Sequence, residues 1–497
     1  MLFTITAFFP EKKGLSMKKR INIPTILISL VLLALSAVFC AAVLRSGLLP
    51  GGWTALLFIA LALADGLLIF LCARPGKKPR FALGLILSLL FAAGLCYGSA
   101  VLNRTVNTLQ SITEAAPQFS RVCVFVGSED TARSIEDVSG DCFGILSTAD
   151  RESTDKAIAQ INEGLGLSIK IQEYEGVTAL LDALFASEIR SMILNPEYLA
   201  IIAEASGYED LEQRVRELSD LQIRETEQDT PAPSPRPQAE EAEDHCFSVY
   251  ISGIDTFGDV SAKSRSDVNI VVTVNTQTHQ ILMITTPRDY YVPLPISDGQ
   301  RDKLTHAGIY GIDVSKGALE MLYDTEIDYY FRVNFTGFQK IIDTMGGIDA
   351  ELDGYSGVMH LNGEEALKHA RNRSYGDQWR GKNQLRIIQA AINKLLSPAI
   401  LGSFNKLLDA TEGSFQTTVP YELIAELVKE QLSANPQWEI LRYNVSGTGD
   451  SEIPFTTMLL DGKPMYLYVM WPDEEDVAAG IEMLRAMHRD EMIQLPE

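Results

Sequence analysis

Five basic side chains are gathered in the stretch ARNRSYGDQWRGKNQLR, residues 370–386, which carries a single acid, Asp377. They are Arg371, Arg373, Arg380, Lys382 and Arg386. A guanidinium group binds phosphate oxygens through two parallel hydrogen bonds and does not lose its proton, so several converging arginines suit a pyrophosphate. Because the whole chain has a formal net charge of -23, we interpret this local excess of positive charge as a site for an anionic ligand.

Three further charged clusters interrupt apolar segments upstream of this stretch. They contain, in chain order, Asp255, Arg265 and Asp267; then Arg288 and Asp289; then Lys303 and His306. Acids would repel an anion unless a divalent cation bridges carboxylate and phosphate, and this makes Asp255 and Asp267 the expected metal ligands. Each cluster alone is typical of a solvated surface or a capped turn. Their combination in one acidic domain favours a phosphate site.

The segments around these clusters predict one layered α/β domain, residues 245–497, which we call the C-terminal domain. Apolar runs rich in β-branched residues predict strands in CFSVYISGID, VNIVVTVNT and HQILMITTP, with a turn near residues 275–278. Helical spacing is found in GALEMLYDT, FTGFQKIIDTMGG, NGEEALKHAR, ELIAELVKEQL, EDVAAGIEMLRAM and the segment that places Leu385, Ile388, Ile392 and Leu395 on one face. PFTTMLLDGKPMYLYVM is predicted to form a hairpin. The alternation indicates a central sheet of mixed strand direction, with charged residues at strand ends, where such sheets commonly bind ligands.

A smaller α/β domain is expected at residues 104–224, and we call it the accessory domain. Strand-like and helix-like segments alternate from RVCVFVG to PEYLAIIAEA, which predicts a largely parallel sheet. No catalytic constellation is visible there, so a scaffold or spacer is the favoured interpretation. Cys123 and Cys142 lie near the starts of two predicted strands, and the sequence leaves open a disulfide or two free thiols. Residues 225–244 are rich in Pro and acids and are predicted to be a disordered linker.

Three apolar runs within residues 21–103 are long enough for helices that cross a membrane. They extend roughly from Ile23 to Leu44, from Trp53 to Cys72 and from Phe81 to Val101. Lys and Arg are concentrated before the first run and between the second and third. The positive-inside rule therefore places residues 1–20 in the cytoplasm and residues 104–497 outside a multi-pass membrane protein. A cleaved signal peptide would explain only the first run, and Met17 is an alternative start to Met1.

The motifs of the C-terminal domain resemble the LytR-CpsA-Psr (LCP) family of bacterial cell-wall proteins. The matching residues are GID at 253–255, RSD at 265–267, PRD at 287–289, KLTHAGIYG at 303–311, FTGFQKIIDTMGGID at 335–349 and LNGEEALKHARNRSYGD at 361–377, followed by the segment from Arg380 to Gln384. Each motif is weak alone, but together they follow the order expected for the family. The resemblance covers the N-terminal runs, the accessory domain and the C-terminal end only loosely.

This resemblance implies a phosphotransferase anchored in the bacterial cell membrane. It would transfer a phosphoglycan, such as teichoic acid, capsular polysaccharide or another anionic polymer, from undecaprenyl pyrophosphate to peptidoglycan with Mg²⁺ or Mn²⁺. The polyprenyl tail would occupy an apolar pocket in an α/β/α layered domain. By position, the implied pyrophosphate-binding residues are Arg265, Arg288, Lys303, Arg371, Arg373, Arg380 and Gln384. The implied catalytic residues are Asp267, Arg288, Arg371 and Arg373, with Asp255 and Asp267 as metal ligands and Asp267 favoured as the base.

Two positions depart from the family pattern, and three other functions stay open. Asn383 stands before Gln384 where arginine is common, and Thr305 stands before His306 where asparagine is common. A polyprenyl-pyrophosphate phosphatase would use the same arginines and metal. A membrane-bound transcriptional attenuator or regulator is disfavoured by the outward topology and by the acidic balance, which also argues against a nucleic-acid partner. A non-catalytic lipid-binding protein would tolerate loss of the two aspartates.

Overall fold

The computed structural model describes residues 23–73, 78–113, 117–224, 245–254, 256, 258–372, 376–397 and 413–496. The predicted linker at 225–244 and two predicted site residues, Asp255 and Arg373, lie outside these ranges. The N-terminal helices belong to one compact unit, and the accessory domain and most of the C-terminal domain belong to a second.

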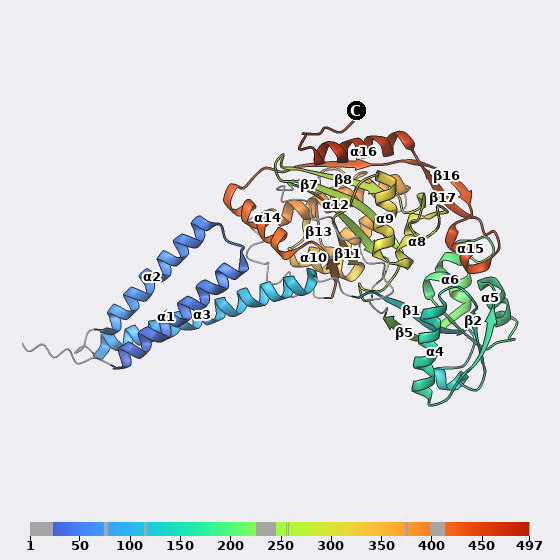
Figure 1. The fold of residues 1–497 in the computed structure, drawn as a ribbon, viewed down its shortest axis with the longest axis horizontal. Coiled ribbons are helices and arrows are strands. Elements are labelled where there is room, and N and C mark those ends of the chain that lie inside the picture. Colours follow the sequence, from blue (N-terminus) through green and yellow to red (C-terminus); the bar gives the residue numbers. More distant parts are fainter. Residues whose placement is uncertain are drawn as a thin grey trace, which may run out of the picture. The chain divides into compact units, whose positions relative to one another are not determined.

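The three apolar runs form three helices, as predicted. They are α1 (Ile23–Ser46), α2 (Gly51–Ala73) and α3 (Lys78–Thr113) (Figure 1). By length and composition, the segments Pro24–Ser46, Gly51–Ala73 and Pro79–Thr108 can each cross a membrane. The third helix continues beyond the apolar run through residues 102–113, which contain no Gly or Pro to end it.

The accessory domain is built on a five-stranded sheet in the order β3-β2-β4-β1-β5. Its strands are β1 (Phe119–Gly127), β2 (Cys142–Leu146), β3 (Lys170–Tyr174), β4 (Ser191–Leu194) and β5 (Val215–Arg224). Its helices are η1 (Ile135–Val138), α4 (Arg151–Leu165), α5 (Val177–Phe185), α6 (Pro196–Ile202) and α7 (Leu211–Arg214). Cys123 and Cys142 are free thiols.

The prediction of a largely parallel sheet in this domain was wrong. β2 pairs in parallel with β3 and β4, whereas β1 pairs antiparallel with both β4 and β5. Strand β5 was not predicted, because its apolar residues do not alternate regularly. The register shifts between Val124 and Phe125 of its partner β1, and such a bulge disrupts the period of two.

The C-terminal domain contains a six-stranded sheet of mixed direction in the order β14-β11-β6-β7-β8-β15. The strands of the whole domain are β6 (Cys246–Ile254), β7 (Ser266–Asn275), β8 (Gln280–Thr286), β9 (Tyr291–Pro293), β10 (Arg301–Lys303), β11 (Tyr329–Asn334), β12 (Ile348–Glu351), β13 (Val358–Leu361), β14 (Phe415–Thr417), β15 (Glu439–Asn444), β16 (Gly447–Glu452) and β17 (Leu467–Pro472). Its helices are α8 (Leu304–Ala307), η2 (Gly308–Tyr310), α9 (Ile312–Tyr323), α10 (Phe335–Thr344), α11 (Gly363–Arg371), α12 (Asp377–Leu395), α14 (Tyr421–Ala434), α15 (Phe455–Asp461) and α16 (Glu474–His488).

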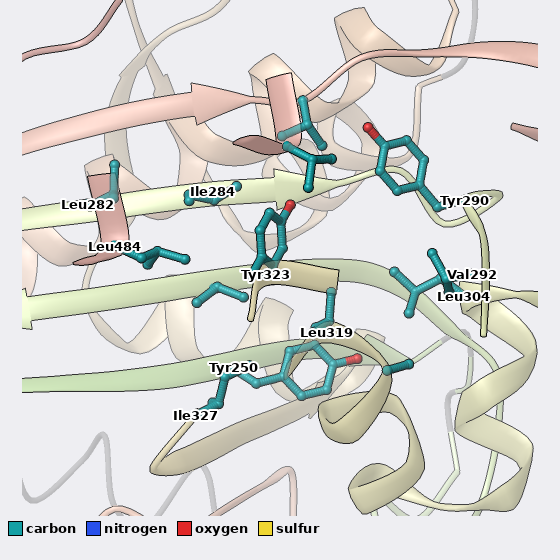
Figure 2. Packing of buried hydrophobic residues seen from close by; sticks show 14 of the residues in the cluster. Tyr250, Leu282, Ile284, Tyr290, Val292, Leu304, Leu319, Tyr323, Ile327 and Leu484 are labelled. Atoms are coloured by element: carbon teal, nitrogen blue, oxygen red, sulfur yellow. The ribbon is translucent and has the colours of Figure 1, made fainter. Parts of the chain in front are cut away.

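Helices cover both faces of this sheet, which gives the expected α/β/α layers. On one face Leu282 and Ile284 of β8 pack with Leu319 and Tyr323 of α9 and with Leu484 of α16 (Figure 2). On the other face the alternate residues of β7 and β8 pack against α12. Because both faces are covered, every residue of β8 is buried, and its centre, Ile281–Ile284, is a continuous apolar run that does not alternate with polar residues.

The prediction of a hairpin in PFTTMLLDGKPMYLYVM was wrong. Its first half is helix α15, which Pro454 precedes and which ends at Gly462 in the left-handed conformation. Its second half is β17, which pairs with β16 and not with the preceding segment. A short helix with apolar and β-branched residues is easily mistaken for a strand when only a few residues define the period.

Candidate functional site

An apolar cavity of about 590 Å³ lies between the sheet and helices α10, α11 and α12. Side chains from β6, β7 and β11 form its floor, and the helices form its walls. The apolar lining residues are Ile251, Val268, Phe331, Val333, Phe335, Phe338, Ile341, Ile342, Leu367, Ala370, Ile387, Ile388, Ala391, Ile392 and Leu395. Such a lining accommodates an aliphatic chain and offers no hydrogen bonds to a polar ligand.

Polar side chains also line this cavity, and most of them come from the predicted phosphate ligands. Asp267, Arg371, Arg380 and Gln384 are among its lining residues. The Arg371 guanidinium carbon lies 4.3 Å from the ring centroid of Phe335, so an apolar neighbour helps to orient it. Gln384 donates from Nε2 to the carbonyl oxygen of Ala370 at 3.1 Å and thereby ties α12 to α11. The cavity therefore combines an apolar interior with cationic groups.

Local sequence signals position the two helices that carry these groups. Asn362 caps α11 by accepting from the backbone nitrogen of Glu365 at 2.9 Å, and the Glu365 carboxylate accepts in return from the Asn362 nitrogen at 3.0 Å. Gly376, at φ 91, precedes α12 in a conformation that side-chain-bearing residues rarely adopt. Arg371 is the last residue of α11, Arg380 lies in the first turn of α12, and both line the cavity.

The remaining cations of residues 370–386 have different placements. Lys382 is exposed and does not line the cavity. Arg386 pairs with Asp353 at 2.5 Å and donates to the carbonyl oxygen of Glu351 at 3.1 Å, which gives it a structural role. Arg373 lies outside the described residues. The basic stretch is therefore only partly devoted to the cavity.

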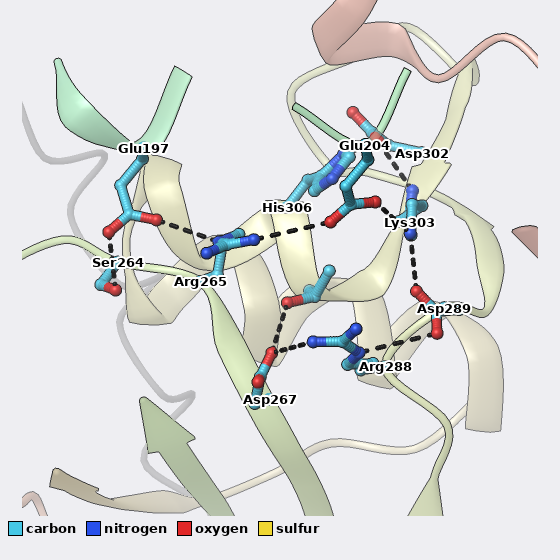
Figure 3. A network of polar contacts seen from close by, with 11 residues as sticks. Glu197, Glu204, Ser264, Arg265, Asp267, Arg288, Asp289, Asp302, Lys303 and His306 are labelled. Atoms are coloured by element: carbon cyan, nitrogen blue, oxygen red, sulfur yellow. Dashed lines mark hydrogen bonds and ion pairs between the residues drawn. The ribbon is translucent and has the colours of Figure 1, made fainter. Parts of the chain in front are cut away.

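A chain of ion pairs connects the cations of the upstream motifs (Figure 3). Arg288 donates from Nη1 to Asp267 Oδ1 at 2.9 Å, and its Nε lies 3.6 Å from Asp289. Lys303 Nζ lies 2.7 Å from Asp289 Oδ1 and is nearly inaccessible to solvent. The structure thus brings Asp267, Arg288 and Lys303 together near the end of β8.

Burial and charge act in opposite directions on the pKa values of this network. Burial alone would raise the pKa of Asp289, but Lys303 and Arg288 outweigh it and lower that pKa below its usual value. Burial alone would lower the pKa of Lys303, but Asp289 and Glu204 outweigh it and raise that pKa. Burial would also lower the pKa of Arg288, and Asp267 and Asp289 raise it instead. All these groups are charged at neutral pH.

A close backbone approach positions Arg265 next to this network. A methyl group at Gly308 would collide with the carbonyl oxygen of Ser264 and would lie 2.9 Å from the nitrogen of Ser266. The glycine of the KLTHAGIYG motif is therefore required because the segment that carries Arg265 passes directly over it. The RSD and KLTHAGIYG motifs are thus parts of one packed unit.

Two acidic residues of the accessory domain belong to this network, and the sequence did not reveal them. Glu197 of α6 accepts from Arg265 Nε at 3.1 Å and from Ser264 Oγ at 3.0 Å. Glu204, just beyond the end of α6, lies 3.5 Å from Arg265 Nη1 and accepts from Lys303 Nζ at 2.6 Å. No local pattern distinguishes these glutamates from solvated acids on a helix, because their partners lie far along the chain.

His306 is a buried structural residue. Its Nδ1 lies 2.6 Å from Asp302 Oδ1, and both side chains are fully buried. The other oxygen of Asp302 accepts from the backbone nitrogen and hydroxyl of Thr456 at 2.7 and 2.5 Å. The pair therefore fastens α15 to the start of α8.

Both departures from the family pattern have a structural explanation. Asn383 is buried outside the cavity lining, and its Oδ1 accepts from the backbone nitrogen of Asp353 at 2.8 Å. Thr305 lies beside the network, where its hydroxyl is 3.4 Å from Asp267 Oδ1 and its nitrogen donates to the carbonyl oxygen of Arg288 at 2.8 Å. Neither change removes a cation from the cavity.

The donor set at the cavity fits a divalent cation that shares its shell with phosphate. Asp267 is the described member of the predicted metal pair, and it lines the cavity together with Arg371 and Arg380. Mg²⁺ is typically held by one or two carboxylates, with substrate phosphates and water completing six oxygens. Among the described residues, a compact group of three metal-binding side chains occurs only elsewhere, at Cys123, Glu217 and Asp220, where Arg121 pairs with both acids.

Comparisons with known proteins add independent information. A profile of the LytR_cpsA_psr family matches residues 214–466, about half of the chain. Two relatives carry the name polyisoprenyl-teichoic acid--peptidoglycan teichoic acid transferase TagU. The one from Bacillus subtilis is 32% identical over 217 residues, which cover 41% of this chain and 69% of that protein. The one from Enterococcus faecalis is 30% identical over 202 residues, covering 38% and 66%. This chain also matches the crystal structure of B. subtilis TagV with 27% sequence identity and a TM-score of 0.42. The match covers 51% of this chain and 100% of the TagV chain.

Proposed function

The chain belongs to the LytR_cpsA_psr family, and from this premise we propose that it is a phosphotransferase that attaches a phosphoglycan to peptidoglycan. The donor in this proposal is a polyprenyl pyrophosphate that carries an anionic cell-wall polymer, such as teichoic acid or capsular polysaccharide. Its relatives are named for transfer of teichoic acid to peptidoglycan. The polymer that the chain transfers is the one attached to the lipid donor that it binds.

One observation carries the proposal: the apolar cavity is lined at the same time by arginines. A polyprenyl pyrophosphate is an amphiphile with a long apolar tail and a compact polyanionic head. The aliphatic lining suits the tail, and Arg371 and Arg380 suit the head. Arg380 is buried, so it acts where water screens charge least.

The proposed reaction is an in-line transfer at phosphorus. The oxygen of a peptidoglycan hydroxyl forms a bond to the phosphorus that carries the glycan. The bond from that phosphorus to the bridging oxygen breaks, and polyprenyl phosphate leaves with the bonding electrons. The hydroxyl proton passes to a base, and Asp267 is our choice among the described residues because it lines the cavity beside the arginines.

Positioning and charge neutralisation account for most of the proposed catalysis. Arg288, Arg371 and Arg380 would offset the negative charge on the transferred and leaving phosphates. Asp267, with Asp255 as its predicted partner, would hold Mg²⁺. The ion would supply further charge neutralisation when it is bound.

The apolar helices support attachment to the membrane in which the donor lies. Three segments are able to cross it, and the distribution of Lys and Arg favours an extracytoplasmic position for residues 104–497. Confinement of enzyme and lipid donor to one leaflet would raise their effective concentration.

A product analysis distinguishes this proposal from the phosphatase alternative. The full chain in lipid vesicles would be supplied with a polyprenyl-pyrophosphate-linked glycan, labelled at the phosphate next to the glycan, and with a soluble peptidoglycan fragment. The proposal predicts label in a phosphodiester between glycan and peptidoglycan. A phosphatase would release the label as a phosphomonoester or free phosphate regardless of the acceptor, and that result would contradict the transferase assignment. Lys382→Ala, an exposed cation outside the cavity, should transfer like the wild type.

A further inference from the structure

The accessory domain supplies two carboxylates to cations that the family motifs assign to the pyrophosphate. Glu197 binds Arg265, and Glu204 contacts both Arg265 and Lys303 (Figure 3). Carboxylate and phosphate oxygens use the same donor geometry on these side chains. A phosphate group that reaches Arg265 and Lys303 therefore competes with an acid that is already bound.

The net charge of this ion-pair network is negative, so an anionic ligand has to displace a carboxylate to bind its cations. Among the described residues, the ion-pair chain joins three cations, Arg265, Arg288 and Lys303, to four carboxylates, Glu197, Glu204, Asp267 and Asp289. The acids exceed the cations by one charge, and the two glutamates from the accessory domain account for that excess. Without them, the remaining network would be net positive.

The two domains are held together independently of these glutamates. The backbone nitrogen and hydroxyl of Thr178 in α5 donate to Asp461 at 3.0 and 2.6 Å. At the start of β1, the backbone nitrogen of Phe119 donates to the carbonyl oxygen of Ser261 at 3.2 Å, and its carbonyl oxygen accepts from the nitrogen of Lys263 at 2.9 Å. Ile309, Leu460 and Leu467 of the C-terminal domain are members of the apolar core of the accessory domain. Exchange of a carboxylate for a phosphate therefore requires a side-chain movement, and the domains can stay docked.

Glu204 is better suited to this exchange than Glu197. Glu197 lies in the first turn of α6 and also accepts a hydrogen bond from Ser264, and its side chain is 15% exposed. Glu204 lies beyond the end of the helix, and its side chain is 26% exposed. Lys303 is held in place by Asp289 as well, so it stays positioned when Glu204 leaves.

We propose that Glu204 is a specificity-determining residue that makes the site select polyprenyl pyrophosphate over polyprenyl monophosphate. A pyrophosphate carries enough negative charge, with enough oxygens, to bind the arginines of the cavity and still displace Glu204 from Lys303. A monophosphate, the lipid product of the proposed transfer, has too little charge to do both. Return of Glu204 to Lys303 then favours release of that product. This inference rests on the proposed function.

The test compares the affinities of the full chain for polyprenyl pyrophosphate and polyprenyl monophosphate of equal tail length in detergent micelles. The variants are Glu204→Gln and Glu163→Gln, an isosteric loss of one charge from an exposed site on α4. We expect Glu204→Gln to bind the monophosphate about tenfold more tightly than the wild type does, because the ligand no longer has to displace a carboxylate from Lys303. Its affinity for the pyrophosphate should increase less. The ratio of the two affinities should therefore fall, whereas Glu163→Gln should match the wild type.

The possible results separate the two claims. An unchanged affinity ratio in a folded Glu204→Gln variant, with both lipids bound by the wild type, overturns this inference and leaves the proposed function intact. A wild type that binds neither lipid overturns both. Glu204→Ala, which also removes the carboxylate, serves as a second variant in which the affinity ratio should fall. An unchanged ratio in a folded Glu204→Ala variant overturns the inference should Glu204→Gln not fold.

Discussion

Lys303 lies between two carboxylates, Asp289 and Glu204, which are 2.7 and 2.6 Å from its Nζ. A buried ammonium group requires such partners, because its own desolvation would otherwise cost several kcal/mol. Arg265, Arg288 and Lys303 are therefore already paired, and a ligand that binds them has to displace a carboxylate. At the scale of single residues, the sequence predicted the charged residues of the C-terminal domain that take part in this network. It did not reveal Glu197 and Glu204, and it could not show that the cations and acids pair with one another.

The first prediction concerns stability and pH. The pKa of Asp289 is lower in the folded protein than its ordinary value of 3.8, so its stabilising effect is fully present above that value. The effect is lost as the pH falls through the folded pKa. The pKa of Lys303 is raised above 10.5, so its contribution is lost only at higher pH. Asp289→Asn should lower the free energy of unfolding at pH 7 by about 3 kcal/mol. The variant should also lose less stability than the wild type as the pH falls below ~4.

Denaturant unfolding of the full chain at several pH values checks this prediction. Asp298→Asn is the matched control, since Asp298 lies on an exposed turn. If Asp289→Asn and the wild type had the same stability at pH 7 and the same acid dependence, the paired network would not contribute as described.

At the scale of elements, strong periodicity made most helices and strands predictable, and short or irregular elements were missed. The predicted helices around Leu319, Ile342 and Ile388 are present as α9, α10 and α12. Each was predictable because its sequence shows an apolar stripe at helical spacing. Strand β5 contains a register shift, and α15 spans only Phe455–Asp461, so neither offers a clear period. The local sequence pattern therefore predicted the order of most elements, but it did not predict the strand directions in the accessory domain.

The close approach at Gly308 leads to a prediction for the element that carries Arg265. Gly308→Ala should push the Ser264–Ser266 segment away from α8, cost about 1–3 kcal/mol of stability, and weaken binding of polyprenyl pyrophosphate. The control is Gly164→Ala in α4, where no neighbouring atom lies within 4 Å of the added carbon. This change should stabilise the protein by about 0.5–1 kcal/mol and should not affect lipid binding. Thermal unfolding and lipid binding are the two measurements. Wild-type values for both in Gly308→Ala would show that the segment is not constrained by this contact.

The walls of the cavity provide a prediction about tail length. Ala391 of α12 lines the cavity, and a larger side chain there would occupy space assigned to the tail. Ala391→Phe should reduce affinity for a long polyprenyl pyrophosphate by about tenfold or more and leave inorganic pyrophosphate binding unchanged. Asn393→Phe places the same ring on the exposed side of α12 and should bind both ligands normally. Equal losses for the long lipid and for inorganic pyrophosphate in Ala391→Phe would contradict a tail site in this cavity.

At the scale of the whole molecule, the accessory domain is part of the site rather than only a spacer. Its α6 region contacts Arg265 and Lys303, and it shares an apolar core with residues of the C-terminal domain. The sequence predicted a separate α/β domain at residues 104–224 but gave no reason to connect it with the phosphate ligands. Contacts between residues so far apart depend on domain docking, which a single sequence does not encode in any local pattern.

The cavity itself was also only partly predictable. The family motifs predicted that a tail-binding pocket exists, and the stripe of Ile388, Ile392 and Leu395 was expected to face a core. In the structure these three residues line an open cavity. Whether an apolar stripe meets a partner or an empty volume depends on how the helices pack, and the residue pattern is the same in both cases.

The central claim is that this cavity and its arginines bind a polyprenyl pyrophosphate, and direct binding tests it most simply. The measurement is the affinity of the full chain for polyprenyl pyrophosphate, comparing wild type, Arg371→Ala and the exposed control Lys382→Ala. We predict loss of about tenfold to a thousandfold in Arg371→Ala, as expected when one partner of a charged hydrogen-bonded contact is removed, and no change in Lys382→Ala. Equal affinities in all three proteins, or no binding by the wild type, would contradict the account.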